Sequence, residues 1–215
     1  MSAVLKPSTA DPRPSRRGEP TWEVAAYFPT QGRWTEADYF ALPDTRMVEL
    51  RHGCLEFLPV PTRMHQLLAR YLFLLLHQYV EKHHLGETHF TGLNVRLEPN
   101  EIRVPDICFL GKARLGDPRQ VQDLADLMIE VVSPGSENRE RDLVHKRTDY
   151  ARTGVAEYWI VDPETDTITV LTLPAGARGD VHGEFRPSQQ ATSVLLPGFT
   201  VDVAACFAAG RGETP

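Results

Sequence analysis

The stretch Asp126-Leu-Met-Ile-Glu-Val-Val-Ser-Pro134, followed by a basic segment from Arg139 to Arg152, decides how this chain is organised. The apolar run is typical of a buried strand, and the basic segment is predicted to be a helix. Glu130 stands in the middle of the apolar run. Because burying an unpaired carboxylate costs several kcal/mol, a carboxylate at this position is expected to be paired, protonated or bound to a metal ion.

A second acid, Asp106, occupies another apolar run, Ile102-Arg-Val-Pro-Asp-Ile-Cys-Phe-Leu110. Side chains alternate along a strand, so Asp106 and Glu130 are each predicted to interrupt an apolar face. Carboxylates on separate strands can bring oxygen ligands together around a hard cation such as Mg²⁺. This pattern favours a divalent-metal hydrolase. The alternative is that each acid pairs with its own arginine or lies at a solvated sheet edge.

The predicted helix after Glu130 offers two cations, Lys146 and Arg147. Both lie one helical turn from apolar residues, so spacing alone does not choose between them. Lysine suits a single contact with water or phosphate, whereas arginine suits a planar anion. The alternative for both is a surface cation whose aliphatic stem covers apolar surface.

Length and composition are those of an ordinary globular protein, with 215 residues, 41% of them hydrophobic and 24% charged. No apolar run approaches the roughly 18 residues needed to span a bilayer, and the N-terminus lacks the pattern of a signal peptide. We therefore expect a cytoplasmic protein without a membrane partner. Three cysteines without CxxC spacing indicate reduced thiols. The net charge of −6 argues against non-specific coating of nucleic acid, although it allows a local basic groove.

The order of helical and strand-like segments predicts an α/β fold with a mixed central sheet and an N-terminal β-hairpin. The predicted hairpin covers residues 46–58, and the predicted strands are 87–97, 101–110, 127–132, 157–161, 167–173 and 193–201. The predicted helices are 35–40, 64–83, 139–152 and 203–209, with Gly86 expected to end the longest. Residues 1–20 are expected to form a disordered arm, and residues 21–215 a single domain.

Several segments, taken together and in order, resemble the Uma-two family, a branch of the PD-(D/E)XK restriction-endonuclease-like superfamily. The resemblance covers about residues 34–207. The matching segments are Val48–Gly53, His65–Leu68, Pro105-Asp106, Ile129–Pro134, Lys146–Tyr150, Gly154–Pro163 and Leu196–Val201. The resemblance implies a restriction-endonuclease-like mixed sheet flanked by helices. It also implies a phosphodiesterase site that depends on Mg²⁺, for which Mn²⁺ can substitute.

The resemblance also implies roles for individual residues. Asp106 and Glu130 are the implied metal ligands, with the carbonyl of Val131 as a third. Glu49 is the implied upstream acid, which approaches the metal directly or through water.

One residue departs from the superfamily pattern. The lysine expected two residues after the glutamate is Val132 here. The resemblance implies that in this branch of the superfamily the following helix supplies the lysine instead, which selects Lys146 over Arg147. His65, which also matches the family, is expected to be a helix-start hydrogen-bond partner rather than a catalytic base.

The sequence therefore predicts a metal-dependent endonuclease acting on phosphodiester bonds, with DNA as the expected substrate. Four basic residues are expected to position the nucleic-acid backbone, namely Arg139, Arg141, Arg147 and Arg152. A homodimer is expected mainly from the resemblance, with a surface supplied by the strand at Tyr158 and Trp159. Two alternatives stay open: a catalytically inactive nuclease-fold protein that binds nucleic acid or a protein partner, and a hydrolase of other phosphoesters.

Overall fold

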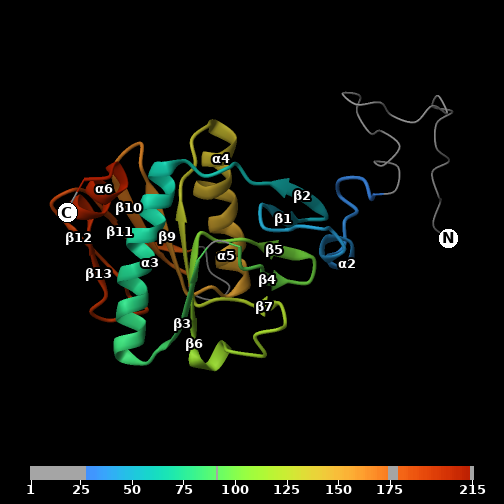
Figure 1. Cartoon of the computed structure of the whole chain (residues 1–215), viewed down its shortest axis with the longest axis horizontal. Helices are drawn as coiled ribbons and strands as arrows, with labels where there is room; N and C mark the ends of the chain where they lie inside the picture. Colours follow the sequence, from blue (N-terminus) through green and yellow to red (C-terminus); the bar gives the residue numbers. More distant parts are fainter. Residues whose placement is uncertain (1–27, 91, 174–178, 214–215) are drawn as a thin grey trace.

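The computed structural model of the chain describes residues 28–90, 92–173 and 179–213. The arm predicted for residues 1–20 lies outside these ranges. A six-stranded sheet forms the centre, and a smaller sheet lies beside it (Figure 1). The central sheet has the order β11 (Asp180–Phe185), β10 (Thr167–Thr172), β9 (Glu157–Asp162), β8 (Leu127–Val131), β6 (Ile107–Gly111) and β3 (Gly86–Phe90).

The smaller sheet contains the predicted hairpin. Its order is β2 (Cys54–Phe57), β1 (Val48–Arg51), β5 (Glu101–Arg103), β4 (Val95–Glu98) and β7 (Gln122–Asp123). The short helix α2 (Glu36–Phe40) begins with a capping box formed by Thr35 and Asp38, and Tyr39 anchors it in the core of this sheet.

The central sheet is mixed, as predicted, because β8 and β9 are parallel while its other neighbours are antiparallel. The connection between β8 and β9 is the helical segment formed by α4 (Ser136–Glu140), a π-helical turn (Arg141–His145) and α5 (Lys146–Thr153). It covers one face of the sheet, while α3 (Arg63–His83) and α6 (Val203–Arg211) cover the other (Figure 1).

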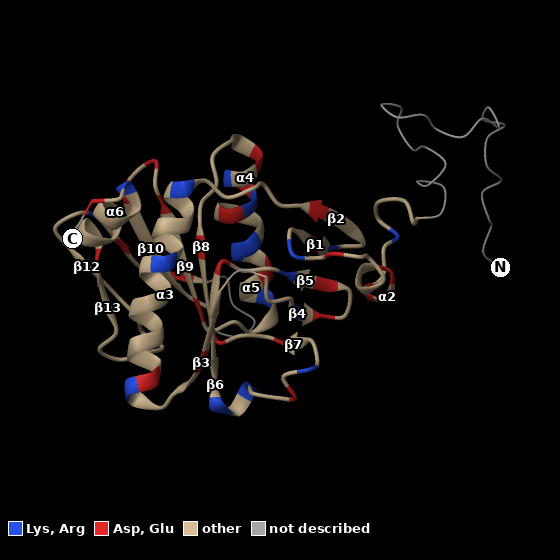
Figure 2. Cartoon of the chain, in the orientation of Figure 1, with Lys and Arg blue, Asp and Glu red and all other residues tan. Residues whose placement is uncertain are grey.

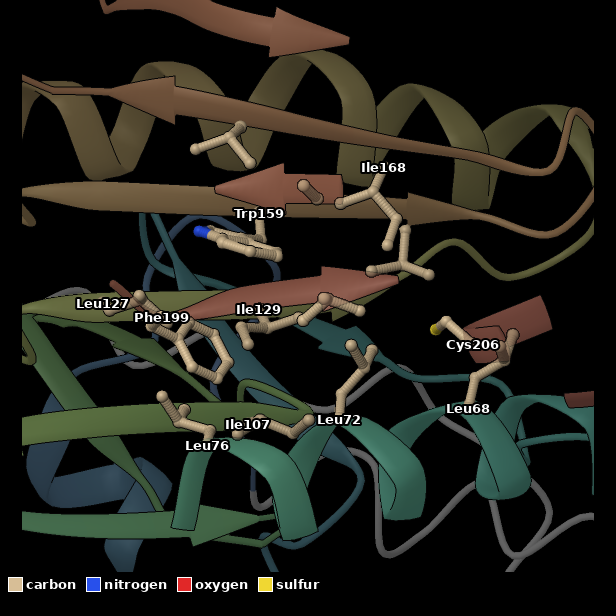
Figure 3. Packing of buried hydrophobic residues seen from close by; sticks show 14 of the residues in the cluster. Leu68, Leu72, Leu76, Ile107, Leu127, Ile129, Trp159, Ile168, Phe199 and Cys206 are labelled. Atoms are coloured by element: carbon tan, nitrogen blue, oxygen red, sulfur yellow. The ribbon is translucent and has the colours of Figure 1, made fainter. Parts of the chain in front are cut away.

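One face of α3 supplies much of the main core. Leu68, Leu72 and Leu76 are fully buried against the central sheet, including Ile129 of β8 (Figure 3). The helix is amphipathic, since Leu74 is 55% exposed while these three leucines are buried.

Helix α3 ends before the predicted glycine. His84 adopts the left-handed conformation (φ 51°) and caps the helix, so the prediction that Gly86 ends it is wrong. Gly86 instead opens β3. A Cβ atom there would lie 1.9 Å from the carbonyl oxygen of Leu110, so glycine is needed for the close approach of β3 to β6.

Two predicted strands are divided in the structure, and a third is much shorter than predicted. Residues 87–97 form β3 and β4, which belong to different sheets. Residues 101–110 form β5 and β6, also in different sheets; Pro105 lies at the break, where it lacks a backbone donor for a sheet ladder. Residues 193–199 are not a strand but connect β12 (Gln190–Thr192) to β13 (Thr200–Asp202), which pair with each other.

The strand at Tyr158 and Trp159 is core rather than surface. Trp159 is fully buried among residues that pack on α3, and Tyr158 is fully buried with residues that pack on α5. The prediction that these aromatics supply a dimer surface is therefore wrong, and homodimerisation itself stays a prediction. Among the described residues, no helix has the length and apolar character needed to cross a membrane.

Candidate active site

A buried ion pair joins the strand acid to the helix lysine. The Nζ atom of Lys146 lies 2.8 Å from Oε1 of Glu130, and both side chains are less than 5% exposed. The hydroxyl of Tyr150, one turn further along α5, donates a hydrogen bond of 2.9 Å to the same oxygen. Of the two cations that spacing left open, Lys146 is the one beside the acid. Arg147 instead donates to the carbonyl oxygen of Gly179.

Two more carboxylates surround the same amine. Oδ1 of Asp142 lies 3.4 Å from Nζ of Lys146, and Oε1 of Glu49 lies 3.7 Å from it. Asp142 comes from the π-helical turn just before α5; such turns are rare and are frequent at functional sites. Asp142 was not predicted from the sequence, although its position four residues before Lys146 on a helix could have indicated it.

The charges in this cluster influence one another strongly. Burial is the main cause that raises the pKa of Glu130. The charge of Lys146 lowers this pKa, whereas the charges of Asp106, Asp142 and Glu49 raise it further, and the net result is a pKa of about 8. Burial would lower the pKa of Lys146, but the surrounding carboxylates outweigh it and raise the pKa above its usual value. The lysine is therefore held in its charged form at neutral pH.

Glu49 behaves differently from Glu130, although it is also fully buried. Burial alone would raise its pKa, but Lys146, Arg103 and the backbone N–H of Val104 together lower it to about 2. Oε2 of Glu49 accepts a 2.6 Å hydrogen bond from Arg103, and Oε1 accepts one of 3.0 Å from Val104. Both oxygens of this carboxylate are therefore occupied by protein groups.

Asp106 lies just before β6, at the end of β8. Its Oδ2 accepts a 2.8 Å hydrogen bond from the backbone N–H of Val131, and it lies 3.1 Å from Nε2 of His65. His65 is thus both a helix-start residue, whose N–H donates to Thr62, and a ring partner of Asp106. Because Val131 directly follows Glu130 in β8, the hydrogen bond from Val131 brings Asp106 to the end of the strand that carries Glu130.

A second residue that the sequence analysis missed is Arg103. Its side chain is fully buried in β5 and bridges Glu49, Glu56 and Asp149. Asp149 belongs to α5, so Arg103 connects the smaller sheet to the helix that carries Lys146. An arginine within an otherwise apolar run is the feature that could have indicated this role.

The donor set can be tested against a hard divalent cation. Among the described residues, neither Oδ1 of Asp106 nor Oε2 of Glu130 accepts a hydrogen bond, so each acid keeps one oxygen available. In the same part of the chain, no group of three or more His, Cys, Asp and Glu side chains is arranged to hold a metal ion. Mg²⁺ is often bound by only one or two carboxylates and keeps several waters, so the two oxygens fit it.

The four arginines predicted to contact nucleic acid all have partners within the protein. Acidic and basic residues accordingly alternate along the segment of α4 and α5 (Figure 2). Arg139 pairs with Asp162 and Glu164, Arg141 with Asp142, Arg147 with the Gly179 carbonyl, and Arg152 with Glu98. Contact with a phosphate therefore requires a guanidinium to share or exchange a partner.

This architecture is that of the restriction-endonuclease-like fold. A similar solved structure is the crystal structure of a putative nuclease belonging to DUF820 from Anabaena variabilis ATCC 29413. The likeness has a TM-score of 0.64 and 17% sequence identity, and it covers 82% of this chain and 98% of that one. The predicted fold is thereby confirmed.

The sequence also matches the profile of a family over most of its length. The Uma2 family, described as "Putative restriction endonuclease", matches residues 36–204, and the chain belongs to that family. The predicted resemblance is therefore confirmed. A search of curated proteins found no match to this chain.

Proposed function

We propose that this protein is a metal-dependent endonuclease that hydrolyses phosphodiester bonds in DNA. The observation that carries the proposal is the convergence of Asp106, Glu130 and Lys146 at the end of β8. Membership of the Uma2 family supports nuclease chemistry, and the available oxygens of the two acids support a hard cation as cofactor.

Asp106 and Glu130 are the residues that would hold Mg²⁺, with the carbonyl of Val131 as a third ligand and Mn²⁺ as a substitute. When bound, the cation would supply charge stabilisation at the scissile phosphate and a lowered pKa for the attacking water. The hydrogen bond from Val131 and the 3.1 Å contact with Nε2 of His65, both to Oδ2 of Asp106, orient that carboxylate so that Oδ1 stays available.

Lys146 supplies a fixed positive charge. Because its pKa is raised, the ammonium group donates hydrogen bonds rather than accepting a proton. In this role it orients the attacking water and stabilises negative charge that develops on the phosphate, without acting as a general base. Burial at 3% exposure holds the amine in place before substrate arrives.

Glu49 acts through its neighbours. Since Arg103 and Val104 already occupy its two oxygens, it suits contact with the metal through water better than direct ligation. Its ionised carboxylate also lies 3.7 Å from Nζ of Lys146, so together with Asp142 it holds the amine in place, and we assign it as a positioning residue.

The arginines Arg139, Arg141, Arg147 and Arg152 are proposed to position the DNA backbone. Each must give up or share a partner to do so. The cost of that exchange is smallest for the most exposed side chain, which is Arg152 at 43%.

The experiment that tests the function compares cleavage by wild type, Asp106→Ala and Glu130→Gln. Plasmid and single-stranded DNA are incubated with Mg²⁺ or Mn²⁺, and circular dichroism confirms folding of each variant. Asp44→Ala is the matched control, because Asp44 is an exposed acid that pairs with Arg46. Cleavage should fall to background in both site variants and persist in the control. Equal cleavage in all four proteins would refute the assignment.

A second candidate function is a catalytically inactive binding protein on the same scaffold. The observation that favours it is the closed pairing of Glu130 with Lys146, together with Val132 at the usual lysine position. Calorimetry separates the two. A nuclease site should bind Mn²⁺ in wild type but not in Asp106→Ala, whereas absence of Mn²⁺ binding in wild type would support the inactive protein.

A further inference from the structure

A pocket of about 230 Å³ lies next to the candidate active site. It is bounded by the start of α3 and by the segments that follow β8 and β9. Its walls are mostly proline and aliphatic side chains, namely Pro59, Val60, Met64, Val132, Pro134 and Pro163. The pocket therefore lies where the two parallel strands end, which is the usual place for a ligand in an open α/β sheet.

His65 belongs to both the pocket and the site. Its ring lines the pocket, and its Nε2 lies 3.1 Å from Asp106, a proposed metal ligand. The residue is 7% exposed, and its Nδ1 atom has no hydrogen-bond partner among the described residues. A buried polar atom without a partner is rare in folded proteins and calls for an explanation, such as a catalytic role or a bound water.

We propose that this pocket receives one nucleobase of the substrate, from a nucleotide next to the scissile phosphate. The inference rests on the proposed function, because a nuclease substrate is what brings a base to this place. A phosphate held beside Asp106 would have its flanking sugar and base within reach of His65 and the pocket behind it. The occupant is thus an unpaired or extruded base.

Size and lining both suit this occupant. Pockets that bury a drug-sized ligand usually measure about 300–1,000 Å³, so a volume of about 230 Å³ suits a smaller, base-sized ligand. Apolar walls can pack against the flat face of any base, which gives affinity without sequence preference. Ser133, also in the lining, provides a hydroxyl that makes no hydrogen bond to the described residues.

Charge beside the pocket fits a nucleotide as well. Glu164 lines the pocket and pairs with Arg139, whose NH1 atom lies 3.0 Å from the carboxylate. An arginine is thereby held beside a residue of the lining, and arginine suits contact with a nucleotide backbone. A purely apolar ligand would make no use of this cation.

The test measures binding of deoxyadenosine 5′-monophosphate to the full chain by NMR, following the methyl signal of Met64. Deoxyribose 5-phosphate and N-acetylphenylalanine amide serve as comparison ligands. The variant is Val60→Trp, which fills the pocket from a position that is 86% exposed, so folding should be unaffected. Val181→Trp is the matched control, because Val181 is 53% exposed on β11, away from the pocket lining.

The nucleotide should shift the Met64 signal, and Val60→Trp should weaken its binding about tenfold or more while Val181→Trp does not. Equal shifts with deoxyribose 5-phosphate, equal binding of the phenylalanine amide, or unchanged affinity in Val60→Trp would each overturn the proposal. DNA cleavage is measured separately on the same variants. Cleavage without base binding removes only the pocket assignment, and base binding without cleavage removes only the nuclease assignment.

Discussion

Replacing Lys146 with methionine should destabilise the fold strongly. The ammonium group is 3% exposed and has carboxylate oxygens at 2.8, 3.4 and 3.7 Å. Removing one partner of a buried ion pair costs about 3–5 kcal/mol, because the remaining charge is left without compensation. Since Glu130 already has a pKa of about 8 and can take up a proton, we expect the lower part of that range, about 3 kcal/mol.

The assay is urea unfolding at pH 7, with the free energy of unfolding obtained for Lys146→Met, Glu130→Gln and the double variant. If the two side chains act as a pair, the double variant should be less destabilised than the sum of the single variants, by about 1–3 kcal/mol. Lys112→Met is the control, because this lysine is exposed, and it should change the free energy by less than about 0.5 kcal/mol.

Two results would refute the reasoning. One is a Lys146→Met protein as stable as wild type, which would mean that the amine does not compensate the buried carboxylates. The other is strict additivity of the two single variants within about 0.5 kcal/mol, which would mean that Glu130 and Lys146 do not interact directly.

Three further predictions concern stability. Glu157→Ala should lower the free energy of unfolding in urea by about 3 kcal/mol or more, because the buried carboxylate accepts hydrogen bonds from Trp159, Ser193, Val194 and Leu195. Glu184→Ala is the control, because Glu184 is exposed, and it should change the free energy little. Equal effects of the two substitutions would contradict the prediction. Gly86→Ala should lower the melting temperature measured by calorimetry, because its Cβ would lie 1.9 Å from a carbonyl oxygen, whereas Gly116→Ala, with open space around it, should not. The pKa of Glu49 is lowered to about 2 in the folded protein, so its ionised carboxylate contributes stability that is complete above the unfolded pKa of about 4.3 and is lost as pH falls towards 2. Glu49→Gln should therefore flatten the dependence of the unfolding free energy on pH between these two values. An unchanged slope would count against this prediction.

Elements with a strong local pattern could be predicted from the sequence. The long apolar helix, the hairpin around Gly53 and the glycine-terminated helix after β8 all appear within a few residues of their predicted bounds. The strand divisions could not be predicted in the same way. Residues 101–110 form one continuous apolar run, and only tertiary pairing assigns its two halves to different sheets.

The residues of the candidate site likewise differ in how far the sequence could predict them. Asp106, Glu130 and Lys146 could be selected because acids in apolar runs are unusual and because the family motif names them. Asp142 and Arg103 were missed, although the spacing of Asp142 from Lys146 and the charge of Arg103 within an apolar run mark them as candidates. Their roles depend on a π-helical turn and on contact between the smaller sheet and α5, which become visible only in the structure. Spacing along the chain does not record which elements meet in space.

The contact of Arg103 with Asp149 has a consequence for how the protein responds to heat. Asp106 and Glu130 lie at the central sheet, but the amine comes from a helix that is tied to the hairpin sheet by several ion pairs. Asp149 of this helix pairs with both Arg103 and Arg51, and Arg152 pairs with Glu98. Loosening of the smaller sheet would let the helix shift while the larger sheet keeps its circular dichroism signature. Nuclease activity should therefore be lost several degrees before the main melting transition.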